Sequence, residues 1–397
     1  MFAVFNRIRN GLRAGLAVAA IGLLSACDPA LVGSVTGPQA PAPSVDTTEP
    51  VKVALLLPTN SGVGELDTIA RDLERAARLA VSDLQGVQVE LTVYSTQRQT
   101  AVAVARAQEA IAAGANIILG PLDGEAAAAV GAATAGSGVN VLAFSNNTAI
   151  AGGNVFLLGQ TFEDSARRVA RYARAQGKTR VLVLHARNIA GEAGRAAVEK
   201  ALAESNLTLA GTTSYEASLP GVTGAVSSAR ATRASSGADA LFLTSNTAGA
   251  LPIFAELLPE AGLGPDRVQY LGLSRWDADP RLHTLSGVQG GWFAMPDRGR
   301  DAAFKARFAS THETQPHILA STAYDGIAAI GSLWARGGDA PLSPQRLTQG
   351  AGFQGATGVF RLLPDGTNER GLAIGSIQGN QVVTVDAAPS GFGGFGS

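Results

Sequence analysis

The chain has 397 residues, of which 46% are hydrophobic and 16% are charged, so it can bury large cores in two domains and is not intrinsically disordered. Its formal net charge of -1 and its scattered basic residues exclude a broad basic surface for nucleic acid or acidic lipid. With 4 histidines and 1 cysteine, the sequence supports neither a zinc cluster nor a disulfide, and we expect no metal and no cofactor.

The amino terminus has the pattern of an export signal. Basic residues at Arg7, Arg9 and Arg13 precede an apolar run over residues 14–24, which is too short for a transmembrane helix. The sequence Leu-Ser-Ala-Cys that ends at Cys27 resembles the bacterial lipobox. This resemblance implies that residues 1–26 are a lipoprotein signal peptide and that a lipid on Cys27 anchors the protein in the periplasm, to the inner or outer membrane. The alternative is an ordinary secretory signal with a chance cysteine.

The segment that follows, residues 27–50, is rich in Pro, Ser, Thr and Ala and has no apolar periodicity. This composition predicts an extended tether. At about 3.1 Å per residue, about twenty residues would span about 60–70 Å. We therefore expect the folded part to stand away from the membrane.

Strands and helices alternate from Val51 onward. The predicted strands are residues 51–57, 87–94, 116–119, 140–144, 155–158, 181–185, 208–215, 240–244, 269–273 and 290–295. The predicted helices are residues 65–84, 101–113, 125–135, 163–176, 194–205, 222–236, 248–261, 301–310 and 321–336. This order predicts an α/β fold with doubly wound, mostly parallel sheets. Residues 352–386 predict hairpins instead, and residues 387–397 predict a disordered tail.

Residues 114–147 form one predicted strand-helix-strand unit. Its two strands end at the loops 120–124 and 145–147, which are rich in turn formers and hydrogen-bonding side chains. Ligands of open α/β sheets bind at the carboxyl ends of the strands, so these loops are candidates for a ligand site. The alternative is that Gly120-Pro121 is only a tight turn and that Asp123 only caps the helix.

Three segments resemble the type I periplasmic binding proteins, the two-lobed fold of the leucine/isoleucine/valine receptors. They are residues 51–62, residues 114–125 with 141–147, and residues 352–383. The likeness implies two Rossmann-like lobes between which the chain crosses three times, near Gly159, Met295 and Gly350. Lobe 1 would then hold residues 51–158 and 296–349, and lobe 2 residues 159–295 and 350–386.

The resemblance also marks candidate site residues. The cleft or docking residues that we expect are Thr59, Asn60, Ser61, Asp123, Gly124, Ser145, Asn146, Asn147, Ala190, Ser245, Asn246 and Trp276. In amino-acid receptors of this kind a hydroxyl is usual at the position of Gly124, a threonine near Asn147 and a covering tyrosine at the position of Ala190. Each missing contact is worth roughly 1–3 kcal/mol, so a site for free amino acids should be weak. For Trp276 and Trp292, core or rim packing is the main interpretation and ligand stacking is the alternative.

A narrower resemblance concerns the envelope lipoproteins that activate penicillin-binding proteins. The lipobox, the Pro-rich tether and the phrases 118–122 and 141–146 are similar to these activators, which use the fold to dock another protein. The helical-repeat domain of the enteric activators has no counterpart in this sequence, which leaves the mode of docking open.

No catalytic motif accompanies these features, so we expect no enzyme. The sequence has no G-x-S-x-G elbow, and the triplet Gly177-Lys178-Thr179 lacks the glycine that a phosphate loop needs five residues earlier. The leading hypothesis is therefore a penicillin-binding protein activator that regulates peptidoglycan synthesis through protein contacts. The alternative is the substrate-binding lipoprotein of an ABC importer for an amino acid or another small molecule.

Overall fold

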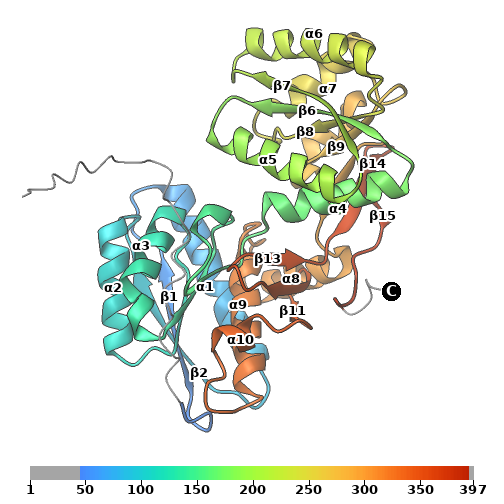
Figure 1. The fold of residues 1–397 in the computed structure, drawn as a ribbon. Helices are drawn as coiled ribbons and strands as arrows, with labels where there is room; N and C mark the ends of the chain where they lie inside the picture. The colour runs from blue at the N-terminus through green and yellow to red at the C-terminus, as the bar shows by residue number, and fades with distance from the viewer. Residues whose placement is uncertain (1–44, 393–397) are drawn as a thin grey trace, which may run out of the picture. The chain divides into compact units, whose positions relative to one another are not determined.

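The structure is a computed structural model that describes residues 45–392, and these residues form two α/β lobes (Figure 1). The first lobe contains a 5-stranded parallel sheet in the order β2-β1-β3-β4-β5. Its strands are β1 (Val51–Leu57), β2 (Val89–Ser95), β3 (Ile117–Leu119), β4 (Asn140–Ala143) and β5 (Val155–Leu157), and the helices between them are α1 (Gly64–Asp83), α2 (Thr100–Ala112) and α3 (Gly124–Thr134).

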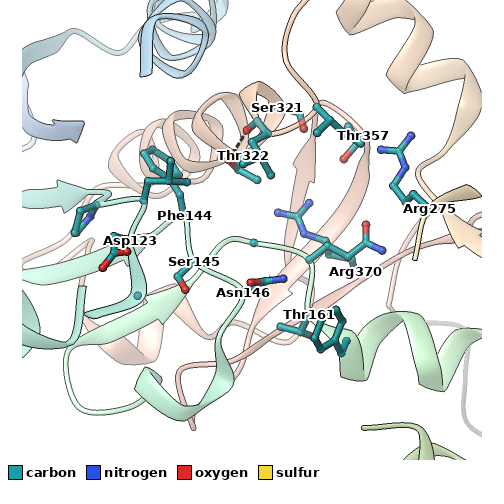
Figure 2. Close-up of a pocket in the computed structure, with 18 of the residues that line it drawn as sticks. Asp123, Phe144, Ser145, Asn146, Thr161, Arg275, Ser321, Thr322, Thr357 and Arg370 are labelled. Carbon is teal, nitrogen blue, oxygen red and sulfur yellow. Dashed lines mark hydrogen bonds between the residues drawn. The ribbon is translucent and has the colours of Figure 1, made fainter. Parts of the chain in front are cut away.

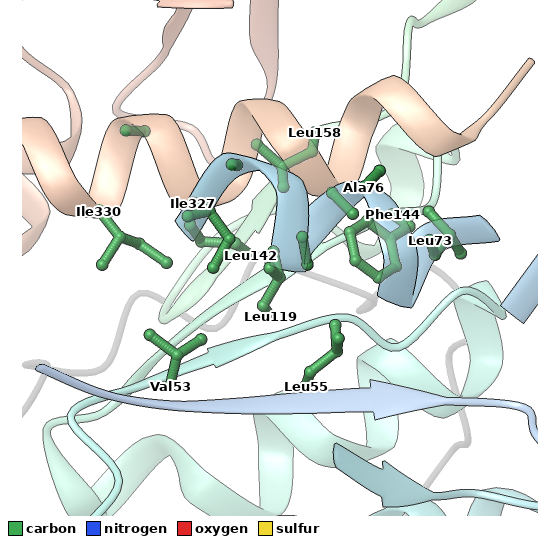
Figure 3. Close-up of a cluster of buried hydrophobic side chains, with 14 of the residues drawn as sticks. Val53, Leu55, Leu73, Ala76, Leu119, Leu142, Phe144, Leu158, Ile327 and Ile330 are labelled. Carbon is green, nitrogen blue, oxygen red and sulfur yellow. The ribbon is translucent and has the colours of Figure 1, made fainter. Parts of the chain in front are cut away.

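Strand β1 shows why this sheet has helices on both faces. Every residue of β1 except Lys52 is buried, as expected for a central parallel strand. Successive side chains point to opposite faces, so Val53 and Leu55 enter one hydrophobic cluster while Ala54 and Leu56 enter another. Figure 3 shows Val53 and Leu55 below the two helices that close the first cluster.

Those two helices are α1 and α9 (Ala320–Trp334). Small residues let α9 approach the sheet closely, since a Cβ at Gly326 would lie 2.5 Å from Leu119 Cδ1. Leu73 and Ala76 of α1 share the same core with Ile330 of α9 (Figure 3). Helix α9, which lies far from β1–β5 in the sequence, thus completes the core of the first lobe.

The second lobe contains a 7-stranded sheet in the order β15-β14-β10-β9-β8-β6-β7. Strand β14 runs antiparallel to both of its neighbours, β10 and β15. Its strands are β6 (Arg180–Ala186), β7 (Thr208–Tyr215), β8 (Ala240–Leu243), β9 (Gln269–Gly272), β10 (Trp292–Met295), β14 (Ala373–Gln378) and β15 (Gln381–Asp386). The helices on its two faces are α4 (Phe162–Ala175), α5 (Ile189–Glu204), α6 (Leu219–Ser236) and α7 (Leu251–Glu260).

A third, 3-stranded antiparallel sheet follows helices α8 (Arg298–His312) and α10 (Pro344–Leu347). It consists of β11 (Phe353–Gly355), β12 (Gly358–Leu362) and β13 (Asn368–Arg370). Phe353 and Phe360 belong to the hydrophobic cluster of the first lobe, whereas β14 pairs with β10 of the second. The chain therefore passes to the second sheet between Arg370 and Ala373. The sequence had placed this passage near Gly350, because a hairpin pattern does not reveal on which core the hairpin packs.

The predicted two-lobed α/β fold is confirmed, and most strand and helix boundaries agree within a few residues. Helix α5 begins five residues earlier than predicted because Asn188 Oδ1 accepts a hydrogen bond from Gly191 N and caps it. Helix α10 and five short 3-10 helices were not predicted. None of the helices within residues 45–392 is long and apolar enough to cross a membrane.

Both ends of the described segment pack onto the fold, in contrast to the expected tether and disordered tail. Val45 N donates a hydrogen bond to Asp339 O at 3.2 Å, and Trp334 Nε1 donates one to Glu49 O at 3.1 Å. At the other end the Arg361 guanidinium lies 4.6 Å from the ring centre of Phe392. The lipobox and Cys27 lie outside the described residues.

Candidate functional site

The main cavity has a volume of about 640 Å³ and lies at the carboxyl ends of the strands of the first lobe. Its wall includes the loops after β3 and β4, the segment that leads from β5 into α4, and the start of α9. Figure 2 shows Asp123, Ser145 and Asn146 around the same space as Thr161 and Thr322. Parallel strands place their carboxyl ends at one edge, which explains how loops distant in sequence meet there.

The loop after β3 is fixed by its backbone. Gly120 has a φ of +92°, and a Cβ there would lie 2.3 Å from Leu56 O, so only glycine fits. Asp123 then caps α3, since its Oδ1 accepts a hydrogen bond from Ala126 N at 3.1 Å. The expected turn and cap are therefore present, and the same loop also lines the cavity.

The loop after β4 brings a hydroxyl close to Gly124. A Cβ at Gly124 would lie 3.2 Å from Ser145 Oγ, and Ser145 is only 8% exposed. The neighbouring strand end thus places a hydroxyl next to position 124, where the family pattern expects one. Asn146 is exposed and also lines the cavity. The sequence predicts both loops, but it does not indicate that Ser145 lies beside Gly124.

Four charged residues line the main cavity, namely Arg98, Asp123, Arg275 and Arg370. Arg275 is paired with Asp277 through two contacts of 3.1 and 2.5 Å. Arg370 is paired with Asp325 at 2.7 Å and also donates to Leu158 O.

The remaining two charges differ in their surroundings. Asp123 lies at the amino end of α3, where the helix dipole favours a carboxylate. Arg98 is exposed and has no ion-pair or hydrogen-bond partner within residues 45–392. Arg98 is therefore the cation in this wall that remains free to meet a ligand.

The rest of the wall combines hydroxyl groups with apolar side chains. The hydroxyls come from Thr96, Ser145, Thr161, Ser165, Ser274, Ser321, Thr322 and Thr357, and the large apolar side chains from Leu66, Leu122, Phe144, Phe162, Leu273, Ile318 and Leu319. Hydrogen-bonding groups set in a mostly apolar cavity are the usual composition of a small-molecule site. The arrangement can orient a polar group and bury an apolar one.

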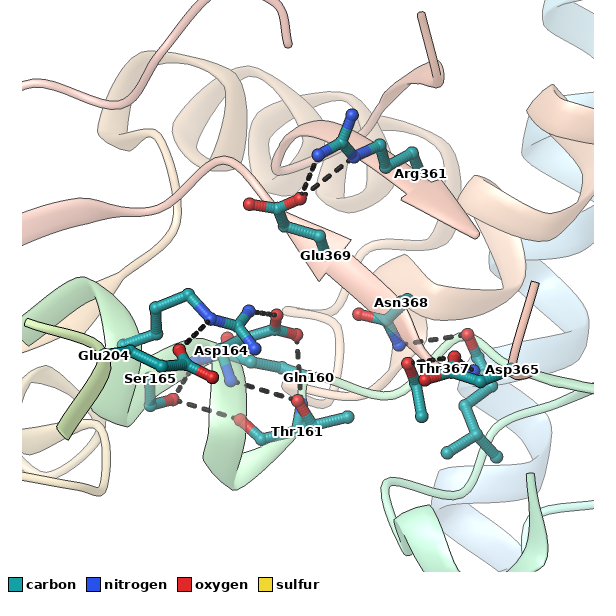
Figure 4. A network of polar contacts seen from close by, with 12 residues as sticks. Gln160, Thr161, Asp164, Ser165, Glu204, Arg361, Asp365, Thr367, Asn368 and Glu369 are labelled. Carbon is teal, nitrogen blue, oxygen red and sulfur yellow. Dashed lines mark hydrogen bonds and ion pairs between the residues drawn. The ribbon is translucent and has the colours of Figure 1, made fainter. Parts of the chain in front are cut away.

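The segment between the lobes carries a buried carboxylate. Thr161 and Asp164 form a capping box at the start of α4, in which Asp164 N donates to Thr161 Oγ1 at 3.1 Å (Figure 4). Burial raises the pKa of Asp164 to about 7, while Thr161, Arg167 and Arg370 oppose the rise. Asp164 Oδ1 has no hydrogen-bond partner among the described residues.

The same region ties the first crossing to β13. Asn368 Nδ2 donates to Leu157 O at 3.0 Å and to Gly159 O at 2.8 Å (Figure 4). Asp325 accepts from Ala356 N at 2.7 Å and pairs with Arg370, while burial acts to raise its pKa. The floor of the cavity is thus held by buried polar contacts.

A second cavity, of about 460 Å³, is lined only by residues from Phe162 to Ser274. Of the predicted site residues, Ala190, Ser245 and Asn246 line this second cavity, while Asp123, Gly124, Ser145 and Asn146 line the main one. The two groups are therefore divided between two neighbouring cavities.

Five predicted residues line neither cavity. Thr59, Asn60 and Ser61 follow β1, where Thr59 O accepts a hydrogen bond from Ser95 Oγ, and Asn147 caps a short helix. Trp276 is a correction, because it is 0% exposed and stacks on Phe293 at 5.7 Å in the core of the second lobe. Core packing, the main interpretation of Trp276, agrees with this burial, and its place among the cleft residues is wrong. Trp292 packs edge-on against Tyr172.

The arginines of this cavity and the hydroxyl residues of α9 are not among the residues that the sequence predicts for the site. Arg370 could have been found, because it is the arginine that ends the family's closing segment in residues 352–383. Ser321 and Thr322 reach the cavity only because α9 packs on the first lobe. No local pattern near these two residues indicates that contact.

Comparison with known families and structures places the chain. Residues 50–381 match the model of the family described as periplasmic binding protein. No curated protein matches the chain. Within the residues that the structure describes, no group of three His, Cys, Asp or Glu side chains could hold a metal ion.

Three solved structures are similar to the chain in fold. A periplasmic ligand-binding protein of a branched-chain amino acid ABC transporter from Burkholderia xenovorans LB400 has 19% identity and a TM-score of 0.66, covering 86% of this chain and 97% of that one. An ABC transporter substrate-binding protein from Desulfitobacterium hafniense, in complex with Leu, has 16% identity and a TM-score of 0.63, covering 85% and 100%. A solute-binding protein from R. palustris in complex with benzoate has 17% identity and a TM-score of 0.56, covering 86% and 97%.

Proposed function

Because the chain belongs to the periplasmic binding protein family, whose members are non-enzymatic binding proteins, we propose that it is the substrate-binding component of an ABC importer. The observation that carries this proposal is the main cavity of about 640 Å³ at the carboxyl ends of the first sheet. Its volume lies within the range of roughly 300–1,000 Å³ that is usual for small-molecule sites. A protein that only docks another protein has no need for such a cavity.

The chemistry of the wall supports a carboxylate ligand with an apolar body. The Desulfitobacterium protein holds leucine and the R. palustris protein holds benzoate, and both compounds combine these two features. In this chain Arg98 and the hydroxyl of Ser145 can meet a carboxylate, while Phe144 and Leu319 can contact an apolar group.

The location follows from the same proposal. A lipid on Cys27 would hold the protein at the inner or outer membrane, in the periplasm, where an importer receives its substrate. Residues 45–50 pack against α9 and its neighbourhood, so the free tether would be shorter than the sequence predicts.

The experiment is a thermal scan of the full chain with leucine and with benzoate. A ligand at 100 times its Kd raises the free energy of unfolding by about 2.7 kcal/mol, which shifts Tm measurably. Arg98→Ala should weaken carboxylate binding by roughly 10- to 150-fold, since a hydrogen bond to a charged group is worth about 1.5–3 kcal/mol. Arg71→Ala is the matched control, because Arg71 is exposed on α1 and does not line the cavity. Unchanged binding by Arg98→Ala would remove Arg98 from the site.

The second candidate function is activation of a penicillin-binding protein, through which the chain would regulate peptidoglycan synthesis. The loop from Thr59 to Gly62 favours it, since Asn60 and Gly62 are exposed and no residue of this loop lines the main cavity. The purified protein should then raise synthase rates, and Glu125→Lys should reduce the gain while Glu260→Lys should not. Unchanged synthase rates with the organism's own penicillin-binding proteins would exclude this function.

A further inference from the structure

The second cavity has a wall without charge. It lies between the carboxyl ends of β6, β7 and β8 and the starts of α5, α6 and α7, so all of its lining residues belong to the second lobe or to the start of α4. No Asp, Glu, Lys or Arg side chain lines it, whereas four charged residues line the main cavity. The two cavities therefore suit chemically different parts of a ligand.

Two of the polar side chains around this second cavity, Asn188 and Ser218, already have internal partners. Asn188 Oδ1 accepts from Gly191 N at 2.8 Å, and Ser218 Oγ accepts from Gly221 N at 3.2 Å. The amino ends of α5 and α6 are thus capped by the chain itself and are not free to bind an anion. Aliphatic and aromatic surface dominates what remains, including Tyr215, Val222 and Ile253.

Ser245 provides one further polar atom in this wall. It is 7% exposed, and its Oγ makes no hydrogen bond of ordinary geometry with any described residue. The hydroxyl lies close enough to Tyr215 to oppose the rise that burial causes in the pKa of that tyrosine. Ser245, like Thr244 and Asn246 in the same wall, carries no charge, so the cavity is uncharged.

Large apolar side chains are exposed at the edges of both cavities. Ile189 is 92% exposed and Leu219 is 62% exposed, and each is the first residue of a helix that borders the second cavity. Ile318, which lines the main cavity, is 42% exposed. Among residues 45–392, the other exposed large hydrophobic residues are Val63, at 39%, and Leu209, at 42%. Exposed apolar groups gathered around cavities indicate a surface that an apolar ligand covers.

The two cavities are adjacent. Phe162 and Ser274 line both of them, so the two cavities meet at these two residues. Arg98 offers the free cation of the main cavity, while Asp123 is already stabilised by the amino end of α3. A single anionic group at one end and an uncharged body at the other would match both walls.

We infer that the substrate is a medium-chain monocarboxylate, whose carboxylate lies in the main cavity near Arg98 and whose apolar chain occupies the second cavity. This inference rests on the proposed function and specifies its substrate class. A free amino acid would leave the second cavity unfilled, and a short peptide would place one of its two charged ends against an uncharged wall. The protein would recognise this ligand by its shape and its single negative charge. No chemical reaction of the ligand is involved.

The test is a calorimetric titration of the full chain with butyrate, hexanoate, octanoate and decanoate. Burial of one methylene is worth about 0.8 kcal/mol in transfer data, so affinity should rise about fourfold with each added methylene until the second cavity is filled. Ala190→Phe places an aromatic ring in the second cavity and should flatten this rise, whereas Ala196→Phe, at an exposed position of the same helix, should preserve it. Decanol should bind about tenfold more weakly than decanoate, because it lacks the charge that meets Arg98.

The outcomes separate the inference from the proposed function. If leucine or benzoate binds and decanoate does not, the protein binds solutes but this substrate class is wrong. Equal affinity of wild type and Ala190→Phe for decanoate would place the chain elsewhere and overturn the inference, as would equal affinity for decanol and decanoate. If none of these compounds binds, both the inference and the proposed function fail.

Discussion

Arg370 Nη1 donates a hydrogen bond to Asp325 Oδ2 at 2.7 Å, and the two side chains are 7% and 0% exposed. This pair joins β13 to α9, and Arg370 also donates to Leu158 O at the end of the first crossing. One arginine thus connects the segment between the lobes, the wall of the main cavity and the core helix of the first lobe.

Loss of this arginine should be costly. Arg370→Ala leaves Asp325 buried without its cation, and removing one partner of a buried pair typically costs about 3–5 kcal/mol in the free energy of unfolding. Arg361→Ala is the matched control on β12, because the partly exposed pair of Arg361 with Glu369 should contribute at most about 1 kcal/mol. Urea denaturation of both variants measures the difference. Equal losses for the two variants would contradict the central role of the buried pair.

The loop after β3 should tolerate no side chain at its first position. Gly120→Ala adds a Cβ at 2.3 Å from Leu56 O and forces alanine to a φ of +92°. Gly62→Ala meets only the conformational cost, since nothing lies within 4 Å of its Cβ and its φ is +74°. That cost is on the order of 1 kcal/mol, and Gly120→Ala should exceed it clearly. A loss of unfolding free energy no larger than that of Gly62→Ala would show that the loop can move.

The stability of the protein should depend on the protonation of Asp164. Burial raises the pKa of this carboxyl to about 7, above the ordinary value of 3.8 that it has in the unfolded chain. The folded state therefore binds the proton more tightly. The contribution of this carboxyl to the free energy of unfolding is greatest below pH 4. Between about pH 4 and pH 7 the contribution falls by about 1.4 kcal/mol per pH unit.

Asp164→Asn tests that dependence, because asparagine cannot ionise. The variant should lack this part of the pH dependence. The free energy of unfolding of the variant, minus that of wild type, should therefore be larger at pH 8 than at pH 4. Glu260→Gln, an exposed change, should leave the wild-type profile intact. Chemical denaturation at a series of pH values gives the comparison. A slope that is the same in Asp164→Asn and in wild type would assign the pH dependence to other groups.

The lipid anchor can be tested through its single cysteine. Cys27→Ser should abolish incorporation of labelled palmitate and release the protein from membranes, since the chain contains no other cysteine to carry a diacylglyceryl group. Wild type serves as the positive control. Label retained by the variant would contradict the lipobox assignment.

Much of the fold could be predicted because each strand can be recognised from its own apolar sequence. The apolar run of β1 was placed at the residues that form it, and the loops after β3 and β4 follow from strands that end at Gly and Ser. The position of β11 to β13 on the first core could not, since hairpin residues such as Phe360 show only alternation. For the site, the loop residues Asp123 and Asn146 were found, whereas Thr322 depends on the packing of α9.

The central claim is that the main cavity holds a small carboxylate, and the most direct measurement is a crystal structure of the full chain grown with the tightest ligand of the titration series. We predict density for a ligand in contact with Ser145, Asn146 and Thr322, with its carboxylate toward Arg98. A structure in which a saturating ligand lies outside this cavity, or in which the cavity holds only solvent, would contradict the account.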